Sequence, residues 1–437
     1  MSEERVFECP AWFDGKKVDE LMFYTRFVKH HQLRAHNGQF FSFNGRVEDE
    51  QVKCMIAEAL YAAVHDDLER RAAAMLKSVR MFASQDEWNP DTGFIHVKNG
   101  TLDVSTRLFS HDRRICQARM NAIFNPGAEQ PRLWLDFLSQ LLEPEDILTL
   151  QEYLGYCLIP STKAQKMLIL IGRGGEGKSC IGYMLKRLLG TGCCNGSIRK
   201  IETNRFAPAS LEGRLVMVDD DLDMNALPST NTLKTIVTAE TPIDLERKGV
   251  QSYQGILNCR FICFGNGTLT SLYDHSDGFY RRQIVLHTRP RPADRVDDPY
   301  LAERFEEELE GILLWCLEGL KRLQDNDYRF TLSENALQHM QALRRENNNI
   351  LDFIQSSGYI RFDPEARITS AFLYDCYRRW CEDNTCRPFS AQRLVSELRE
   401  HSAELGLTYS NNIPIGGGKR VRGFRGIASM QEPFGSI

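Results

Sequence analysis

The sequence predicts an α/β protein in which a parallel sheet carries a phosphate-binding loop, and three observations support this fold class. Apolar runs at 167–171, 215–218 and 261–264 alternate with helical or looped stretches, which is typical of strands and crossovers. The first run leads directly into a glycine-rich loop, and a helical pattern follows that loop. Ligands of open α/β sheets bind beyond the carboxyl ends of the strands, so we expect the loop at that edge.

The glycine-rich loop matches the pattern G-x-x-x-x-G-K-[ST], and four of its first six residues are glycine. Small residues let backbone N–H groups close around phosphate oxygens, and the helix N-terminus adds its positive dipole end. We expect Lys178 to reach the β- and γ-phosphates and the Ser179 hydroxyl to bind Mg²⁺. A chance glycine turn before a helix is the alternative. The residues expected to contact a nucleotide are Gly172, Gly174, Gly175, Glu176, Gly177, Lys178, Ser179 and Cys180.

Composition indicates an ordinary globular protein. The chain of 437 residues is long enough for two or three domains, with 42% hydrophobic and 26% charged residues. Its formal charge of −5 means that a nucleic-acid surface must be a local patch. The 13 cysteines show no zinc-type spacing, and the chain has no apolar signal core or membrane-length run. We therefore expect reduced thiols, no membrane partner and a cytoplasmic location.

A run of carboxylates follows the second apolar run, at Asp219, Asp220 and Asp221. A nucleotide hydrolase needs one acid for the Mg²⁺ shell and a neighbouring acid that polarises the attacking water. We assign Asp219 and Asp220 to these roles. Acidic turns after strands are common, so the run is informative only because it follows a phosphate loop.

Two further signals follow the third apolar run. This run ends at Gly265-Asn266, where an amide would lie near the γ-phosphate and the attacking water, although a strand-terminal turn would use the same residues. Arg281 and Arg282 then precede another strand pattern. In an assembled ring, one of these arginines would reach the neighbouring subunit's γ-phosphate as an arginine finger. An exposed basic patch would explain the pair equally well.

A basic hairpin tip is predicted between the acidic run and Asn266. Residues 233–249 have the pattern of a helix, a turn and a strand that ends at Arg247, Lys248 and Gly249. Two cations at such a tip suit contact with a phosphate backbone, and a solvated turn is the alternative. A basic helix is also predicted at 70–80, and its cations have two interpretations, a solvated face or contact with DNA.

The order of these motifs resembles that of the superfamily 3 helicases. Phosphate loop, acidic strand end, lysine-bearing hairpin, strand ending in asparagine and arginine pair follow one another as in that family. The sequence is most similar to the branch found in phages, plasmids and large DNA viruses, which is often fused to a primase. The similarity extends outside this core to Asn99-Gly100, Trp134, Leu150 to Gly155, Leu373 to Cys381 and the basic strand 419–425.

The resemblance implies an AAA+-like ATPase core and a C-terminal winged-helix-like domain, and the pattern of residues 1 to about 85 adds a mainly helical N-terminal domain. Such proteins work as hexameric rings that use ATP and Mg²⁺ to move along single-stranded DNA and to open forked DNA. It therefore implies a helicase in the replication of a phage, plasmid or other mobile element in a bacterial host cytoplasm. Expected partners are DNA, further copies of the chain and a separate primase or polymerase.

Residue by residue, the resemblance assigns family roles to the positions found above. Lys178 and Ser179 match the phosphate and Mg²⁺ residues, and Lys248 falls where the family's pore hairpin contacts DNA. The remaining matches are the acidic pair Asp219 and Asp220, the sensor Asn266, and the finger at Arg282 or Arg281.

Two departures from the family qualify these roles. The family often has glutamate where Asp220 stands, and the shorter side chain leaves Asp221 as a substitute on the attacking water. No primase domain is evident, so we expect no primer synthesis by this polypeptide. A nucleotide-regulated DNA-binding switch, for origin recognition or defence, with slow hydrolysis is the alternative function. A small-molecule kinase shares the phosphate loop but needs neither Asn266 nor the arginine pair.

These patterns divide the chain into five parts. They are an N-terminal α+β region at 1–130, a helical linker or collar region at 131–164, the ATPase core at 165–298, a helical lid region at 299–357 and the winged-helix-like domain at 358–437. Within the first part, a β-hairpin is expected at 92–103 with its turn at Asn99-Gly100.

Overall fold

The structure is a computed structural model that describes residues 10–64, 66–84, 92–222, 227, 229–239, 241–267, 277–292, 298–347, 349–386, 388–415 and 419–430. The chain divides into two compact units, Met1–Met340 and Gln341–Ile437. Within the described residues, no helix has the length and apolar character needed to cross a membrane.

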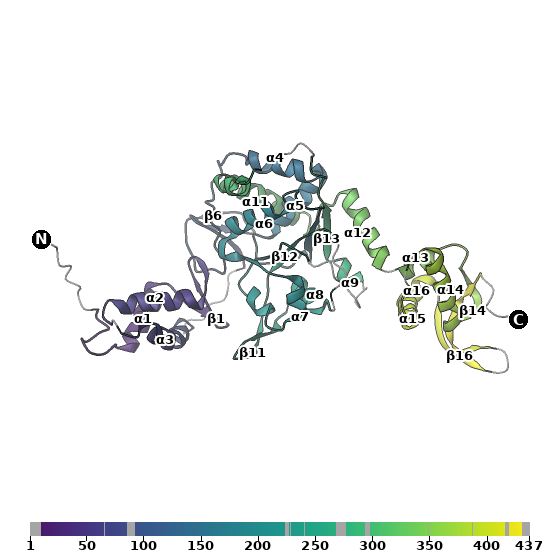
Figure 1. Ribbon diagram of the computed structural model, residues 1–437, viewed down its shortest axis with the longest axis horizontal. Coiled ribbons are helices and arrows are strands. Elements are labelled where there is room, and N and C mark those ends of the chain that lie inside the picture. The colour runs from purple at the N-terminus through teal and green to yellow at the C-terminus, as the bar shows by residue number, and fades with distance from the viewer. Residues whose placement is uncertain are drawn as a thin grey trace. The chain divides into compact units, whose positions relative to one another are not determined.

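A five-stranded sheet forms the centre of the first unit (Figure 1). All its strand pairs are parallel, and every residue of β7 and β12 is buried, as expected for a sheet covered on both faces. The three strands predicted from apolar runs are confirmed, whereas β8 was not predicted. The strand order, with residue bounds, is β13 (Gln283–His287), β7 (Met167–Ile171), β12 (Arg260–Gly265), β9 (Val216–Asp219) and β8 (Cys193–Asn195).

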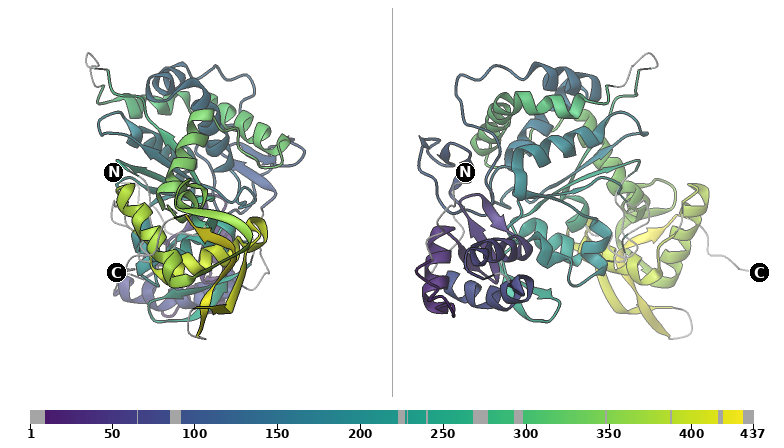
Figure 2. Two further views of the ribbon diagram at one scale, coloured as in Figure 1. Left: turned by 90° about the vertical axis from the view of Figure 1, so that its right-hand side faces the viewer. Right: turned by 60° about the vertical axis from the view of Figure 1, so that its left-hand side comes forward.

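Helices cover both faces of this sheet (Figures 1 and 2). Leu168 and Leu170 of β7 share one core with side chains of α4, α5, α6 and α11, and α7 and α8 lie on the other face. The regions predicted to be helical at 131–164 and 299–357 do contain helices, but the single long helix that the pattern of 299–325 favours is divided into α10, η3 and α11. The helices are α4 (Arg132–Leu141), α5 (Pro144–Tyr156), α6 (Lys178–Leu189), α7 (Ile198–Thr203), α8 (Asn231–Thr238), α9 (Asp277–Tyr280), α10 (Leu301–Arg304), α11 (Leu309–Asp325) and α12 (Glu334–Asn347), with 3-10 turns η1 (Gly190–Gly192), η2 (Pro208–Leu211) and η3 (Phe305–Glu308).

Two glycines allow α5 and α11 to approach closely. A Cβ on Gly155 would lie 2.3 Å from the Cys316 carbonyl oxygen, and a Cβ on Gly319 would lie 2.2 Å from the Gln151 carbonyl oxygen. Any side chain at either position would therefore push the helices apart. This contact anchors the helical layer that lies behind the sheet.

The N-terminal region has its own core, formed by three helices and a small antiparallel sheet (Figure 1). Asn37 and Gly38 join β1 to β2, and their φ angles of 48° and 73° are those of a two-residue hairpin turn. Residues 40–46 have the pattern of a strand that ends in a turn, which β2 confirms, but the turn at Asn37-Gly38 was not predicted. The elements are α1 (Glu20–His30), β1 (Arg34–His36), β2 (Gln39–Ser42), β3 (Gly45–Val47), α2 (Asp49–Tyr61) and α3 (Leu68–Ala83).

Two further antiparallel sheets belong to the first compact unit. The hairpin predicted at 92–103 is confirmed, but Gly100 pairs with Val97, so its turn lies at Lys98-Asn99 and not at Asn99-Gly100. The hairpin predicted before Lys248 is also present. The strands are β4 (Phe94–Val97), β5 (Gly100–Asp103), β6 (Phe109–Ser110), β10 (Ile243–Arg247) and β11 (Val250–Gly255).

The second unit combines helices with a three-stranded antiparallel sheet of order β14-β16-β15. The sequence pattern favours helices at 369–382 and 390–404 and a turn at 416–418. Both helices are confirmed, β14 was not predicted, and residues 416–418 lie outside the described residues. Ile350 and Phe353 of α13, in the range expected to be a lid, pack into this unit's core. The elements are α13 (Asn349–Gln355), β14 (Ile360–Thr369), α14 (Ser370–Asp383), α15 (Ala391–Glu400), α16 (Ser402–Leu405), β15 (Thr408–Pro414) and β16 (Arg420–Ser429).

Candidate functional site

The glycine-rich loop leaves the carboxyl end of β7 and ends where α6 begins at Lys178. Gly174, Gly175 and Gly177 have φ angles of 104°, 80° and 103°, a region that side chains other than glycine rarely adopt. The Gly172 N–H donates to the Gly265 carbonyl oxygen at 3.0 Å and ties the loop to β12. Backbone conformation therefore accounts for the glycine composition on which the sequence analysis relied.

The loop already holds an anion, which is the carboxylate of its own Glu176. Glu176 Oε2 accepts hydrogen bonds from the Gly174 N–H and from Lys178 Nζ, each at 2.9 Å, and Oε1 accepts one from the Arg173 N–H at 2.5 Å. The Glu176 and Lys178 side chains are only 4% and 9% exposed. Converging N–H groups and an ammonium group are the donors that phosphate oxygens require. The loop residues therefore fit a nucleotide phosphate, which would compete with this carboxylate.

Electrostatics keep the Glu176 carboxylate charged. Burial raises its pKa, but the hydrogen bonds from Lys178 and from backbone N–H groups outweigh burial and leave the pKa below its usual value. The sequence analysis expected Glu176 to contact a nucleotide; that contact remains a prediction. The pairing with Lys178 was not expected.

The acidic run stands at the same edge of the sheet. Asp219 is the last residue of β9 and is 3% exposed, and its Oδ2 accepts a hydrogen bond from the Ile198 N–H at 2.7 Å. Burial raises the pKa of Asp219, against the opposing effect of backbone hydrogen bonds. Asp220 and Asp221 follow and are exposed.

Asn266 lies between the loop and the acids. Gly265 pairs with Ile171 at the end of β7, and Cys263 pairs with Asp219 at the end of β9. Asn266 follows Gly265 directly and is exposed. The strand register thus brings the loop, the acidic run and Asn266 to one edge.

The arginine pair stands at the opposite edge. The Arg282 carbonyl oxygen accepts a hydrogen bond from the N–H of Met167, the first residue of β7, at 2.8 Å. The Arg282 guanidinium donates to the Gly278 carbonyl oxygen and is half-buried, whereas Arg281 is exposed. Within one chain, the pair therefore does not join the phosphate loop, and the finger role remains a prediction.

Two residues near the loop were missed from the sequence. The Thr288 N–H donates to the Ile171 carbonyl oxygen at 2.8 Å, and a Cβ on Gly172 would lie 2.3 Å from Thr288 Oγ1. A Cβ on Gly175 would lie 3.3 Å from Arg291 Nη1. Because β13 runs parallel beside β7, residues after β13 reach the loop edge. The strand pattern after Arg282 could therefore have predicted that the residues following β13 lie near the loop.

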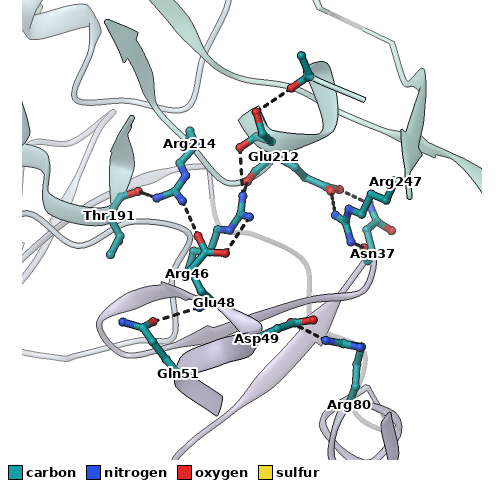
Figure 3. A network of polar contacts seen from close by, with 12 residues as sticks. Asn37, Arg46, Glu48, Asp49, Gln51, Arg80, Thr191, Glu212, Arg214 and Arg247 are labelled. Atoms are coloured by element: carbon teal, nitrogen blue, oxygen red, sulfur yellow. Dashed lines mark hydrogen bonds and ion pairs between the residues drawn. The ribbon is translucent and has the colours of Figure 1, made fainter. Parts of the chain in front are cut away.

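The basic hairpin tip differs from expectation at one of its two cations. Lys248 is exposed in the turn between β10 and β11. Arg247 instead folds back, pairs with Glu212 and donates to the Asn37 carbonyl oxygen at 3.0 Å (Figure 3). Only Lys248 is left outermost at the tip, and DNA contact by either residue remains a prediction.

Two protein families match separate parts of this chain. A family of unknown function (DUF5906) matches residues 170–282, and a Poxvirus D5 protein-like family matches residues 345–414. The search of curated proteins finds no match. The first range begins in β7, ends on Arg282 and so encloses the loop, the acidic run and Asn266. The second match fits the large-DNA-virus branch that the motif order resembles.

A solved structure shares the fold. An A-form apo structure of the NrS-1 C-terminal region (305–718) has a TM-score of 0.53 at 12% identity, covering 93% of this chain and 99% of that chain. Another A-form apo structure of that region has a TM-score of 0.49 at 14% identity, covering 85% and 82%. The first likeness shows that this chain has the mixed α/β fold of that region.

Proposed function

We propose that this protein is an ATP-dependent DNA helicase or translocase of the superfamily 3 kind, acting as a ring in the replication of a phage, plasmid or other mobile element. The observation that carries this proposal is the meeting of the glycine loop, the acidic run and Asn266 at one edge of a parallel sheet. An AAA+-like core is supported by five parallel strands with the loop at the end of β7. The Poxvirus D5-like match supports a replication role.

The chemistry proposed for this edge is ATP hydrolysis. Phosphate oxygens would replace the Glu176 carboxylate as the acceptors of the loop N–H groups and of Lys178. Ser179 and Asp219 would hold Mg²⁺. Bound Mg²⁺ neutralises charge that develops on the phosphate oxygens. Asp220, exposed beyond the end of β9, would accept the proton of the attacking water, and Asn266 would orient that water.

DNA contact is proposed for two exposed basic elements. Lys248 at the tip of β10–β11 would contact a single strand in the centre of the ring and shift as ATP is hydrolysed. The second unit would act as a winged-helix-like DNA-binding domain. Its exposed cations along β16 and just before it are Lys419, Arg420, Arg422 and Arg425.

Steady-state ATP hydrolysis with and without single-stranded DNA tests the proposal. A translocase should be stimulated by the strand, and Lys178→Ala should abolish turnover because the phosphates lose their buried cation. A nucleotide-regulated switch would instead hydrolyse slowly and ignore the strand. A protein that stays monomeric with nucleotide and forked DNA, and never opens the fork, would contradict the ring mechanism.

A further inference from the structure

Glu212 gathers donors from separate parts of the chain. Its Oε1 accepts a hydrogen bond from Asn37 Nδ2 at 3.1 Å, and its Oε2 accepts one from the Tyr253 hydroxyl at 2.7 Å. Oε2 also pairs with the Arg247 guanidinium, and the Glu212 side chain is 7% exposed. A buried carboxylate destabilises the folded state unless it is ion-paired and hydrogen-bonded. These contacts therefore hold one another in place, because losing any of them exposes the cost of the buried charge.

The donors come from two hairpins that meet at Glu212 (Figure 3). Asn37 belongs to the β1–β2 turn, whereas Arg247 belongs to the β10–β11 hairpin, where its guanidinium lies 4.9 Å from the centroid of the Tyr253 ring. Gly38 has a φ of 73°, and a Cβ there would lie 3.1 Å from Arg247 Nη1, so both the backbone conformation and the close approach of the two tips favour glycine. Lys248 follows Arg247 directly.

The same network continues away from the hairpin. Arg46 Nη1 donates to the Glu212 carbonyl oxygen at 2.6 Å, Arg46 Nη2 lies 3.2 Å from Glu48 Oε2, and Arg214 Nη2 lies 2.5 Å from Glu48 Oε1 (Figure 3). Burial lowers the pKa of Arg46, and the charge of Arg214 lowers it further. Among the described residues, the Glu48 carboxylate pairs with Arg46 and Arg214, and neither of them lies in the hairpin.

We propose that Glu212 is a positioning residue that fixes the β10–β11 hairpin, and with it Lys248, against the β1–β2 tip of the N-terminal region. Glu212 also lies shortly before β9, the strand that ends in Asp219. The hairpin cannot shift against the N-terminal region unless the contacts of Glu212 break, so the two move together. We call the contacts of Glu212 with Asn37, Arg247 and Tyr253 the clamp. The clamp is argued from these contacts alone, and its consequence for DNA binding rests on the proposed function of Lys248.

Hydrogen exchange of the full chain, without nucleotide or DNA, tests the clamp. Glu212→Gln keeps the side-chain shape but leaves Arg247 without its anion, so the amides of 243–255 should exchange about tenfold faster. Glu48→Gln is the matched control, because it removes one carboxylate from the same network without touching the hairpin. Its hairpin exchange should stay at the wild-type rate.

The functional readout is hydrolysis stimulated by single-stranded DNA. Glu212→Gln should lower the stimulation about fivefold while basal hydrolysis stays at the wild-type rate, because the hairpin is displaced and the nucleotide edge is not. Lys248→Ala is measured alongside. If Lys248→Ala leaves stimulation unchanged, the DNA role of the hairpin is wrong, and the exchange data still judge the clamp separately.

Unchanged hairpin exchange in Glu212→Gln, or equal loosening in Glu48→Gln, would overturn the clamp. Tyr253→Phe covers the case in which Glu212→Gln does not fold. It removes only the hydroxyl donor, and the hairpin amides should then exchange about threefold faster. An unchanged rate in this variant would equally overturn the proposal.

Discussion

The two edges of the five-stranded sheet gather different chemistry. The edge at which the strands end carries the glycine loop, the carboxylates after β9 and Asn266. The edge at which they begin carries Arg281 and Arg282 before β13 and the Glu212 clamp before β9. The first edge brings together, within one chain, N–H donors and an ammonium group that fit a phosphate. The second edge exposes Arg281 and the hairpin that carries Lys248, both of which are available to a molecule outside this chain.

The length of the strands separates the two sets of residues. The five residues of β7 rise about 16 Å, which is far beyond the roughly 3 Å of a hydrogen bond. Arg281 and Arg282 therefore cannot serve the phosphate loop of their own chain. A ring in which the starting edge of one subunit faces the ending edge of the next would make both edges useful.

The largest effect that tests this comparison is expected from Arg281→Ala. An arginine finger supplied by a neighbour contributes about a thousandfold to turnover, so kcat should fall by that order while nucleotide affinity stays close to wild type. Mixing this variant with Lys178→Ala is decisive, because each would supply what the other lacks. Activity should return in the mixed oligomers.

Arg282→Ala is the neighbouring control. Its guanidinium is engaged with the Gly278 carbonyl oxygen, so we expect a lower melting temperature and a smaller loss of turnover. If mixing restores nothing, or if Arg282 carries the larger loss and Arg281 none, the exposed arginine is not the finger.

Asp220→Asn tests the ending edge. Asp220 is exposed and adjacent to the buried Asp219, and a general base contributes at least about a hundredfold to turnover. Turnover should fall by that order while nucleotide still binds. Asp221→Asn is the matched control and should stay near wild type; the opposite result would move the water-activating role to Asp221.

Much of the ending edge was predictable because its signals are local. An apolar run followed by glycines and Lys178 specifies strand, loop and helix within a short stretch of chain. The Glu212 clamp was not predictable, because Asn37 and Glu212 are separated by 175 residues and nothing in either local sequence indicates the contact. The pairing of Glu176 with Lys178 lies between these cases. The carboxylate in the loop was visible, but the sequence analysis expected it only to contact a nucleotide and did not foresee its pairing with Lys178.

Glu176→Gln should give a smaller effect, with the opposite sign. The wild-type carboxylate is charged and occupies the donors that phosphate needs, so its neutral replacement should bind nucleotide about three- to tenfold more tightly. Fluorescent-nucleotide titration measures this change. Unchanged or weaker binding would mean that the carboxylate leaves the loop at no cost, and that the self-occupied loop does not limit affinity.

The smallest effect is expected for the stability of Asp219→Asn. Burial raises the pKa of Asp219 above its usual 3.8, so the folded state binds its proton more tightly than the unfolded state. Its stabilising contribution is present below 3.8 and is lost as the pH rises through the raised pKa. Asparagine cannot ionise and can still accept from the Ile198 N–H. The variant should therefore melt about 2–4 °C higher near neutral pH.

The sign of this change in melting temperature shows whether the charged Asp219 carboxylate stabilises or destabilises the fold. The gain in melting temperature should disappear in acid, where wild-type Asp219 is also neutral, and hydrolysis should fall because the predicted Mg²⁺ ligand is lost. Thermal melts across the acid range and turnover at neutral pH measure both quantities. A variant that is less stable at neutral pH would show that Asp219 supports the fold as an anion. Its burial at the ending edge would then be structural rather than a stability cost kept for catalysis.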